Sequence, residues 1–331
     1  MNPINQATSS LRTGLDQPLI SIIIVTYNSS EVILSCLESV CSQFKRRVEV
    51  IVVDNASKDS TADIVRQKFP EVNLIENKQN LGFAAGVDSG AGKAHGEFLL
   101  LLNPDSTLRD GFFDNLLQYI DRTPQASIIG ARLTDDHGRD QPSCWETPGL
   151  KTLTFEALLP YSLSLSLLAR SPESTREVDM VSGACMAVKR EVFDRLGGLD
   201  RHFFMYYEDA DFCLRAVRAG YHVYFCHEIS ATHRLRKSPG SYSSSFFQNL
   251  YLSKILFFRK NYSRSFYVVA WLFMVAGILL RIPAYFLAGV LLFNKQLLRL
   301  SKYHTFVLRN ILNPEASKRS RRSGGSTRFK A

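Results

Sequence analysis

Short apolar runs and amphipathic stretches alternate along the N-terminal two-thirds of the chain. LISIIIVTYN, which begins at Leu19, is a continuous β-branched run typical of a buried strand, and EVILSCLESVCSQF has the period of an amphipathic helix. VEVIVVDNAS and TADIVRQKF repeat this order, and VNLIEN, AAGVDSGAGKA and GEFLLLLNPDS form a third unit. This succession predicts an α/β fold with a mainly parallel sheet flanked by helices.

Polar side chains follow the predicted strands. In open α/β sheets, ligands bind at the carboxyl ends of the strands, so these side chains are expected along one rim. They are Thr26, Tyr27, Asn28, Asp54, Asn55, Asn103 and Asp105. Residues 132–178 have no clear period, and we interpret them as an irregular excursion near the site that contains Trp145.

Two aspartates on this rim each allow two interpretations. Asp105, after LLLLNP, can hold Mg²⁺ or Mn²⁺ together with substrate phosphates, although N-P-D is also good turn chemistry. Asp54 can accept hydrogen bonds from a nucleobase or ribose, or it can cap the next helix or form an Asx-turn before it. The glycines of NLGFAAG would let the backbone approach a ligand closely beside Asn80 and Phe83.

Three acids crowd together in HFFMYYEDADFCLR, directly after a run of aromatic residues. The pattern predicts a helix that starts at the acids and ends at Gly220, and macrodipole complementarity alone can explain Asp211. The preceding rings exclude water and raise carboxylate basicity, as a general base requires, so Glu208 and Asp209 are candidates. The same cluster could instead hold a metal. His233 could complete a cation site, although an isolated histidine is more often structural.

The C-terminal region is apolar and basic. Residues 266–280 are uncharged, and a second apolar run follows Arg281 and contains Pro283. Since a spanning helix needs about 20 apolar residues, it forms here only if Arg281 is tolerated. The alternatives are an interfacial or re-entrant helix pair bent at Arg281 and Pro283, and an ordinary buried hairpin.

Charge is unevenly distributed. Residues 251–331 contain 15 Lys and Arg and one acid, Glu315, whereas the whole chain carries a net charge of +9. The asymmetry indicates an acidic partner surface, and the hydrophobicity of the region favours a membrane over nucleic acid. The six cysteines include no C-x-x-C pair, and no signal peptide is recognisable, which favours a reducing cytoplasm.

The order of these motifs resembles the family 2 glycosyltransferases, inverting enzymes of the GT-A fold. Five blocks carry the resemblance across about residues 19–240: SIIIVTYNSS, VVDNASKDST, NLGFAAG, LLLLNPDS and VSGACMAVKREVFDRLGGLDRHFFMYYEDADFCLRAVRAGY. Within the family, the pattern looks like the bacterial rhamnosyltransferases that extend lipid-linked precursors of O-antigen or other cell-envelope polysaccharides.

The resemblance implies roles for individual residues. Thr26, Tyr27 and Asn28 would line the nucleotide pocket, and Asp54 would read a uracil or thymine imide. Asn103-Pro104-Asp105 occupies the place of the D-x-D motif, which makes Asp105 and His233 the expected ligands of Mg²⁺ or Mn²⁺. Further positions match the ribose block (Asn80, Gly82, Phe83) and the catalytic base (Asp209). We also expect Trp145 and Glu208 on the acceptor side. Asn103 replaces the first acid of the usual motif, which weakens cation binding, and Asp88 stands where Asn is common.

We therefore expect an inverting glycosyltransferase that moves L-rhamnose from dTDP-L-rhamnose to a polyprenyl-diphosphate-linked glycan at the cytoplasmic face of the inner membrane. The expected organisation is a flexible leader (1–18), a GT-A domain (19–240), a helical membrane-associating region (241–312) and a basic disordered tail (313–331). A sugar nucleotidyltransferase is the second hypothesis, but VTYNSSEV lacks its glycine-rich basic loop. A non-catalytic membrane scaffold is the third. The sequence does not determine the oligomeric state.

Overall fold

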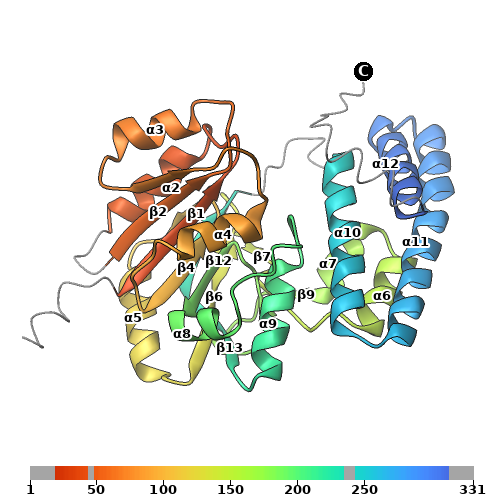
Figure 1. The fold of residues 1–331 in the computed structure, drawn as a ribbon. Coiled ribbons are helices and arrows are strands. Elements are labelled where there is room, and N and C mark those ends of the chain that lie inside the picture. The colour runs from red at the N-terminus through yellow and green to blue at the C-terminus, as the bar shows by residue number, and fades with distance from the viewer. Residues whose placement is uncertain (1–18, 44–47, 235–242, 313–331) are drawn as a thin grey trace, which may run out of the picture. The chain divides into compact units, whose positions relative to one another are not determined.

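The computed structural model describes residues 19–43, 48–234 and 243–312 (Figure 1). These residues form two compact units, and each is described separately below. The first unit contains residues 19–147 and 166–234, and the second combines residues 148–165 with residues 243–312. The expected leader (1–18), the boundary at 240/241 and the basic tail (313–331) lie outside the described residues.

The strands are β1 (Ile20–Thr26), β2 (Val48–Asp54), β3 (Asn73–Glu76), β4 (Phe98–Leu102), β5 (Ser106–Leu108), β6 (Ala126–Thr134), β7 (Asp140–Gln141), β8 (Cys144–Trp145), β9 (Ala169–Arg170), β10 (Arg176–Glu177), β11 (Met180–Val181), β12 (Cys185–Lys189) and β13 (His222–His233). The helices are α2 (Ile33–Cys41), α3 (Thr61–Lys68), α4 (Phe83–Ala91), α5 (Phe112–Arg122), α6 (Leu150–Leu158), α7 (Tyr161–Leu168), α8 (Arg190–Arg195), α9 (Glu208–Arg218), α10 (Ser244–Asn261), α11 (Arg264–Leu291) and α12 (Lys295–Leu312).

A mixed sheet with the order β10-β13-β6-β12-β4-β1-β2-β3 is the centre of the first unit. Strands β3, β2, β1 and β4 are parallel, whereas β12 is antiparallel to both of its neighbours. The predicted α/β sheet is thereby confirmed. The chain order reverses between β1 and β4, so the carboxyl ends of these strands form the switch point where such sheets bind ligands.

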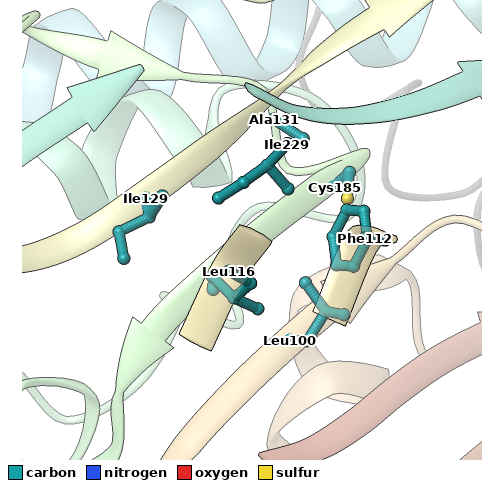
Figure 2. Close-up of a pocket in the computed structure, with 8 residues that line it drawn as sticks. Leu100, Phe112, Leu116, Ile129, Ala131, Cys185 and Ile229 are labelled. Carbon is teal, nitrogen blue, oxygen red and sulfur yellow. The ribbon is translucent and has the colours of Figure 1, made fainter. Parts of the chain in front are cut away.

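Helices cover both faces of this sheet. Alternate residues of β1, β2 and β4 pack with α2, α3 and α5 into one apolar core. Figure 2 shows a small gap within that core, where Leu116 and Phe112 of α5 face Leu100, Cys185 and Ile229; the apolar lining makes it a packing defect rather than a ligand site.

On the opposite face α4 lies very close to the strands. A Cβ atom added to Gly86 would approach Val25 to 2.6 Å, and one added to Gly90 would approach Ile23 to 2.6 Å. Small residues in this helix are therefore a packing requirement. They explain why AAGVDSGA forms a helix in spite of its glycines.

The excursion expected at 132–178 is more ordered than its sequence indicated. It contains the end of β6, four two-residue strands and the helices α6 and α7. The prediction of an irregular segment is wrong because α6 is stabilised by a distant part of the chain. Leu153 and Ala157 of α6 are buried in the second unit, and a Cβ on Gly277 of α11 would lie 2.8 Å from the Ala157 backbone.

In the second unit α6 is joined by α10, α11 and α12. Helix α11 continues through Arg281 and Pro283 as one helix, so the alternative of a helix pair bent at these residues is not observed. By length and composition α11 could cross a membrane. The Arg281 side chain is buried; its Nη1 donates to the Tyr251 hydroxyl at 3.2 Å, and its Nη2 donates to the carbonyls of Leu159 at 2.5 Å and Glu156. The guanidinium thus satisfies the carbonyls at the C-terminal end of α6.

Candidate active site

The carboxyl ends of β1 and β2 are joined through the Asp54 side chain. Thr26 Oγ1 donates to Asp54 Oδ1 at 2.9 Å, and Ser57 donates to both carboxylate oxygens, from Oγ at 2.5 Å and from its backbone N–H at 2.9 Å. Thr26 and Asp54 are buried, whereas the Tyr27 side chain is 46% exposed. Asp54 therefore forms the turn that the sequence offered as an alternative, and Oδ2, which accepts only one of these three hydrogen bonds, keeps a lone pair for a ligand.

Asn28 belongs to the same rim and has a left-handed backbone, with φ 51°. Its N–H donates to Ser57 Oγ at 2.8 Å, and its Oδ1 accepts the Lys58 N–H at 2.8 Å. Asn28 therefore closes the loop after β1 onto the loop after β2. The two loops form one continuous surface beside Tyr27.

Asn55 connects the end of β2 to the turn before α4 and to Asn77. Its Nδ2 donates to the carbonyl of Gly82 at 3.0 Å, and its Oδ1 accepts from Asn77 Nδ2 at 2.8 Å. Because Asn55 is buried at the end of β2, it fixes the start of α4 relative to the sheet. Its position directly after Asp54, at a strand end, was the available signal.

The turn before α4 contacts the loop that leads to the acid cluster. Asn80 Oδ1 accepts the N–H of Gly82 at 2.9 Å, and the N–H of Phe83 donates to the Phe204 carbonyl at 2.8 Å. Gly82 has φ +83°, and a Cβ there would lie 2.3 Å from the Phe204 oxygen. Only glycine fits this position, so the predicted close backbone approach is made to the protein itself.

The strand end at Asn103 and Asp105 meets His233. Asp105 Oδ1 lies 3.3 Å from His233 Nε2, and Asn103 Nδ2 lies 3.4 Å from the same nitrogen. Ser106 of β5 pairs with His233 of β13, which explains how residues so distant in sequence become neighbours. Gln141 Nε2 donates to the His233 carbonyl at 2.8 Å and holds the strand end in place.

One carboxylate, one imidazole and one amide form a donor set that fits Mg²⁺ or Mn²⁺ if phosphate oxygens complete the coordination. Within residues 19–43, 48–234 and 243–312, no group of three or more His, Cys, Asp and Glu side chains is arranged to hold a metal without such help. The arrangement favours a cation that binds together with a phosphorylated ligand.

The acid cluster begins α9 after two consecutive residues with left-handed backbones, Tyr206 (φ 70°) and Tyr207 (φ 66°). Such non-glycine conformations cost about 1–3 kcal/mol each and are concentrated at functional sites. Asp209 Oδ2 accepts the Gly183 N–H at 3.0 Å, and Oδ1 accepts the Ala210 N–H at 2.8 Å. Burial raises the pKa of Asp209 above its usual range, although these two hydrogen bonds oppose the effect.

Glu208 is the second acid of the cluster. Its side chain is buried, and Oε2 has no hydrogen-bond partner among the described residues. Burial, reinforced by the charge of Asp209, raises the pKa of Glu208 well above its usual range. Both effects favour the neutral form of this carboxyl group.

Asp211 has a different role from its neighbours. It is fully buried and pairs with Arg215 Nε at 2.8 Å, while Arg215 also donates to the carbonyls of Leu196 and Gly198. These bonds join α9 to the loop before it. The structural interpretation of Asp211 is therefore supported by a specific ion pair.

Gly183 and Ala184 bring the metal side and the acid side of the site together. The Ala184 carbonyl accepts the Asn103 N–H at 2.9 Å, and the adjacent Gly183 N–H donates to Asp209. A Cβ on Gly183 would lie 3.6 Å from the Phe83 ring, so the turn before α4 reaches the same point. The sequence offered one signal for this pair, because VSGACM belongs to the longest of the five blocks.

Trp145 lies on β8, where it pairs with Met180 of β11. Strand β11 leads directly to Ser182 and Gly183, so Trp145 belongs to the small sheet β11-β8-β9 on this side of the unit. The predicted residues are thus found at the Asp54 rim, at the turn before α4, at the Asp105–His233 pair, at the start of α9 and on β8.

Several known proteins are similar to this chain. The model of the family "Glycosyl transferase family 2" matches residues 21–197. The N-acetylglucosaminyl-diphospho-decaprenol L-rhamnosyltransferase of Mycobacterium tuberculosis is 28% identical over 240 residues, which cover 67% of this chain and 78% of that protein. The low-salt glycan biosynthesis hexosyltransferase Agl10 of Haloferax volcanii is 29% identical over 265 residues, covering 76% and 80% respectively.

Solved structures show the same fold. The mannosyltransferase PcManGT from Pyrobaculum calidifontis, in complex with GDP-Man and Mn²⁺, aligns with a TM-score of 0.53 and 18% identity over 91% of this chain and 87% of that one. GalNAc-T7 with UDP, GalNAc and Mn²⁺ aligns with a TM-score of 0.51 and 16% identity over 73% and 50%. At these identities the likeness concerns the fold alone.

Proposed function

Because the chain belongs to glycosyl transferase family 2 and is a glycosyltransferase, we propose that it transfers L-rhamnose from dTDP-L-rhamnose to a polyprenyl-diphosphate-linked glycan with inversion at the anomeric carbon. The activity in the name of the Mycobacterium tuberculosis relative supports this donor and acceptor class. The family membership decides against a sugar nucleotidyltransferase and favours an enzyme over a scaffold.

The single observation that carries the proposed chemistry is the position of Gly183 and Ala184. These adjacent residues contact Asp209 on one side and Asn103 on the other. These contacts support a single site that holds a base and a diphosphate-binding pair, as a displacement reaction requires.

Asp209 is proposed as the general base. Its carboxylate removes the proton from an acceptor hydroxyl, the oxygen forms a bond to the anomeric carbon, and the bond from that carbon to the nucleoside diphosphate breaks. The proton remains on Asp209, and the electron pair leaves with the diphosphate. The Gly183 and Ala210 N–H groups hold the carboxylate in one orientation, and its raised pKa strengthens it as a base.

Asp105 and His233, with Asn103 beside them, would hold a Mg²⁺ or Mn²⁺ ion. When bound, such an ion neutralises the charge of the leaving diphosphate. Asp54 and the exposed Tyr27 ring are proposed to bind the nucleobase, with Thr26 and Asn28 shaping the pocket. Asn80, Gly82 and Phe83 would follow the ribose.

Trp145 and Glu208 are proposed to bind the acceptor. Glu208 in its neutral form can donate a hydrogen bond next to Asp209 without adding a second negative charge. The acceptor lipid and the basic second unit would place the reaction at the cytoplasmic face of the inner membrane. We also propose residues 19–240 as the catalytic domain and residues 241–312 as the membrane-associating region.

A donor screen tests the function. The full chain is incubated with radiolabelled dTDP-L-rhamnose, UDP-N-acetylglucosamine, UDP-galactose or GDP-mannose and a polyprenyl-diphospho-N-acetylglucosamine acceptor, with and without EDTA. We expect chelator-sensitive transfer of rhamnose with an inverted anomeric centre, and a loss of about 10²–10⁴-fold in Asp209→Asn with nucleotide binding retained. If a different sugar is transferred and the transfer still depends on Asp209, the proposed donor is wrong but the proposed mechanism stands. If no donor supports transfer, the proposed function is contradicted.

A further inference from the structure

The surface of α11 is divided into two faces of different composition. Its buried positions face the other helices of the second unit and include Ala270, Gly277 and Arg281. Every exposed residue from Val268 to Leu291 is apolar. The large side chains among them are Val268, Val269, Leu272, Leu279, Leu280, Phe286, Leu287, Val290 and Leu291. Water-soluble surfaces rarely present so long an apolar stripe, so this face needs an apolar partner.

The charges of the same unit identify that partner. Its described residues contain ten Lys and Arg but one carboxylate, Glu156, which is already paired with Lys254 at 2.6 Å. The exposed cations on α12 recur at helical spacing: Lys295, Arg299, Lys302 and Arg309. A surface that is both apolar and anionic complements this unit. An anionic lipid leaflet has both properties, whereas nucleic acid offers no acyl phase.

The packing of α12 against α11 decides between spanning the bilayer and lying in it. Ser301 Oγ donates to the Ile282 carbonyl at 2.9 Å, and a Cβ on Gly289 would touch Leu298 at 2.8 Å. Helix α12 therefore runs back along α11, and Arg299 and Lys302 lie level with its second half. If α11 crossed the hydrocarbon core, these exposed cations would enter with it, at about 2.5–3.5 kcal/mol each.

Arg281 does not conflict with lipid contact by the exposed face. Its guanidinium is turned inward to the Tyr251 hydroxyl and to the carbonyls that end α6. The lipid-facing stripe thus remains uncharged along its length.

We infer that α11 lies in the plane of one leaflet, with its apolar stripe among the acyl chains and the cations of α12 at anionic headgroups. The second unit is then a monotopic lipid-binding module and not a membrane span. Binding to the leaflet would bring the enzyme to its lipid-linked acceptor, so the biological role of this module rests on the proposed function. Its tests measure lipid binding and topology without sugar transfer, so either proposal can fail alone.

Vesicle flotation tests the partner. The full chain is mixed with phosphatidylcholine vesicles or with vesicles containing 30% phosphatidylglycerol, at low and high salt. We expect binding to the anionic vesicles that weakens with salt, and a loss of about 30-fold in Arg299→Gln/Lys302→Gln, from about 1 kcal/mol per cation. The matched control Lys68→Gln/Lys93→Gln removes two exposed cations of the first unit and should bind normally.

The apolar stripe is tested by Leu280→Gln/Leu287→Gln, whose side chains are 56% and 58% exposed. Flotation should fall at least tenfold while the far-ultraviolet circular dichroism stays unchanged. The inference would be overturned if both double variants float with the vesicles as well as the wild type does. It would also be overturned if light scattering showed a dimer without lipid and Leu280→Gln/Leu287→Gln abolished that dimer.

Topology is tested with an impermeant maleimide on inside-out membrane vesicles from an expressing bacterium. Ser265→Cys, at the start of α11, and Gln296→Cys, after its end, are both exposed positions. The wild-type chain, in which the six cysteines are buried or partly buried, gives the background labelling. Both variants should be labelled from the cytoplasmic face. Protection of Gln296→Cys until detergent is added would show that α11 spans the bilayer.

Discussion

His233 Nε2 lies 3.3 Å from Asp105 Oδ1, although His233 ends β13 and Asp105 lies in the turn between β4 and β5. Asp105 precedes β5, and the pairing of Ser106 with His233 fixes their proximity through the backbone. The pair therefore does not depend on flexible side chains. A cation bound here would meet a preformed carboxylate and imidazole.

The first prediction concerns metal dependence. His233→Gln should raise the Mn²⁺ concentration needed for half-maximal transfer by about 10–100-fold, because a ligand is lost while Asp105 remains. His202→Gln is the matched control, since its exposed ring pairs with Asp200 beside it. The measurement is a metal titration of the EDTA-treated enzyme. Equal curves for both variants would contradict a metal role for His233.

The second prediction concerns the pH dependence of transfer. A general base acts in its deprotonated form, and burial raises the pKa of Asp209. The rate should therefore rise with pH along an acidic limb that lies above the ordinary aspartate value of about 3.9. A profile of kcat/KM against pH measures this limb. A rate that is flat down to pH 4 would argue against Asp209 as the base.

The third prediction separates stability from catalysis at Glu208. Its pKa is raised in the folded protein, so its contribution to stability is complete below the unfolded value of about 4.3 and is lost as pH rises through the folded value. Because glutamine does not ionise, Glu208→Gln does not lose stability in this way as the pH rises. The variant should unfold a few degrees higher than the wild type at pH 8, and the difference should shrink toward pH 4.5.

Thermal unfolding across this pH range provides the measurement for Glu208→Gln. Its transfer activity should fall if the neutral carboxyl donates to the acceptor, since an amide donates with different geometry. A variant that is less stable than the wild type at every pH would show that Glu208 is not held neutral.

The fourth prediction concerns the contact between Gly82 and Phe204. Gly82→Ala places a Cβ 2.3 Å from the Phe204 carbonyl at φ +83°, which should destabilise the fold by about 1–3 kcal/mol and weaken donor binding. Gly92→Ala, at the other end of the same helix, meets no atom closer than 3.5 Å and has φ −65°. This control should be neutral or slightly stabilising in denaturant unfolding.

The fifth prediction distinguishes Asp211 from Asp209. Asp211→Asn breaks a buried ion pair with Arg215 and should lower the free energy of unfolding by about 3–5 kcal/mol. Asp194→Asn removes the same i,i+4 pairing with Arg190 at a more exposed position and should cost less than about 1 kcal/mol. Urea unfolding compares the two. Equal losses would mean that the burial of the Asp211 pair has no energetic weight.

The local parts of the site could be predicted from the sequence. Apolar runs located β1, β2 and β4, and the polar residues that end them marked the rim at Thr26, Asp54 and Asn103. The helix starting at Glu208 was visible from its acids and its later arginines. These features depend on residues that are neighbours along the chain, so periodicity and turn chemistry report them.

Contacts between distant segments could not be predicted in the same way. The bond from Gly183 to Asp209 depends on how β11 and α9 pack, and no local pattern encodes it. Helix α6 appeared irregular because its apolar side is completed by α11, far along the chain. The motif resemblance indicated that such residues belong together, but the geometry that joins them required the fold.

Ala157 of α6 packs closely against Gly277 of α11, and this contact determines which fragments of the enzyme can be prepared. Helix α6 is inserted in the middle of the catalytic sequence but is covered by the C-terminal helices, so a protein shortened after β13 would leave Leu153 and Ala157 uncovered. Such a fragment should aggregate. A well-behaved catalytic fragment would instead require removal of both segments, with residues 148–165 replaced by a short polar linker.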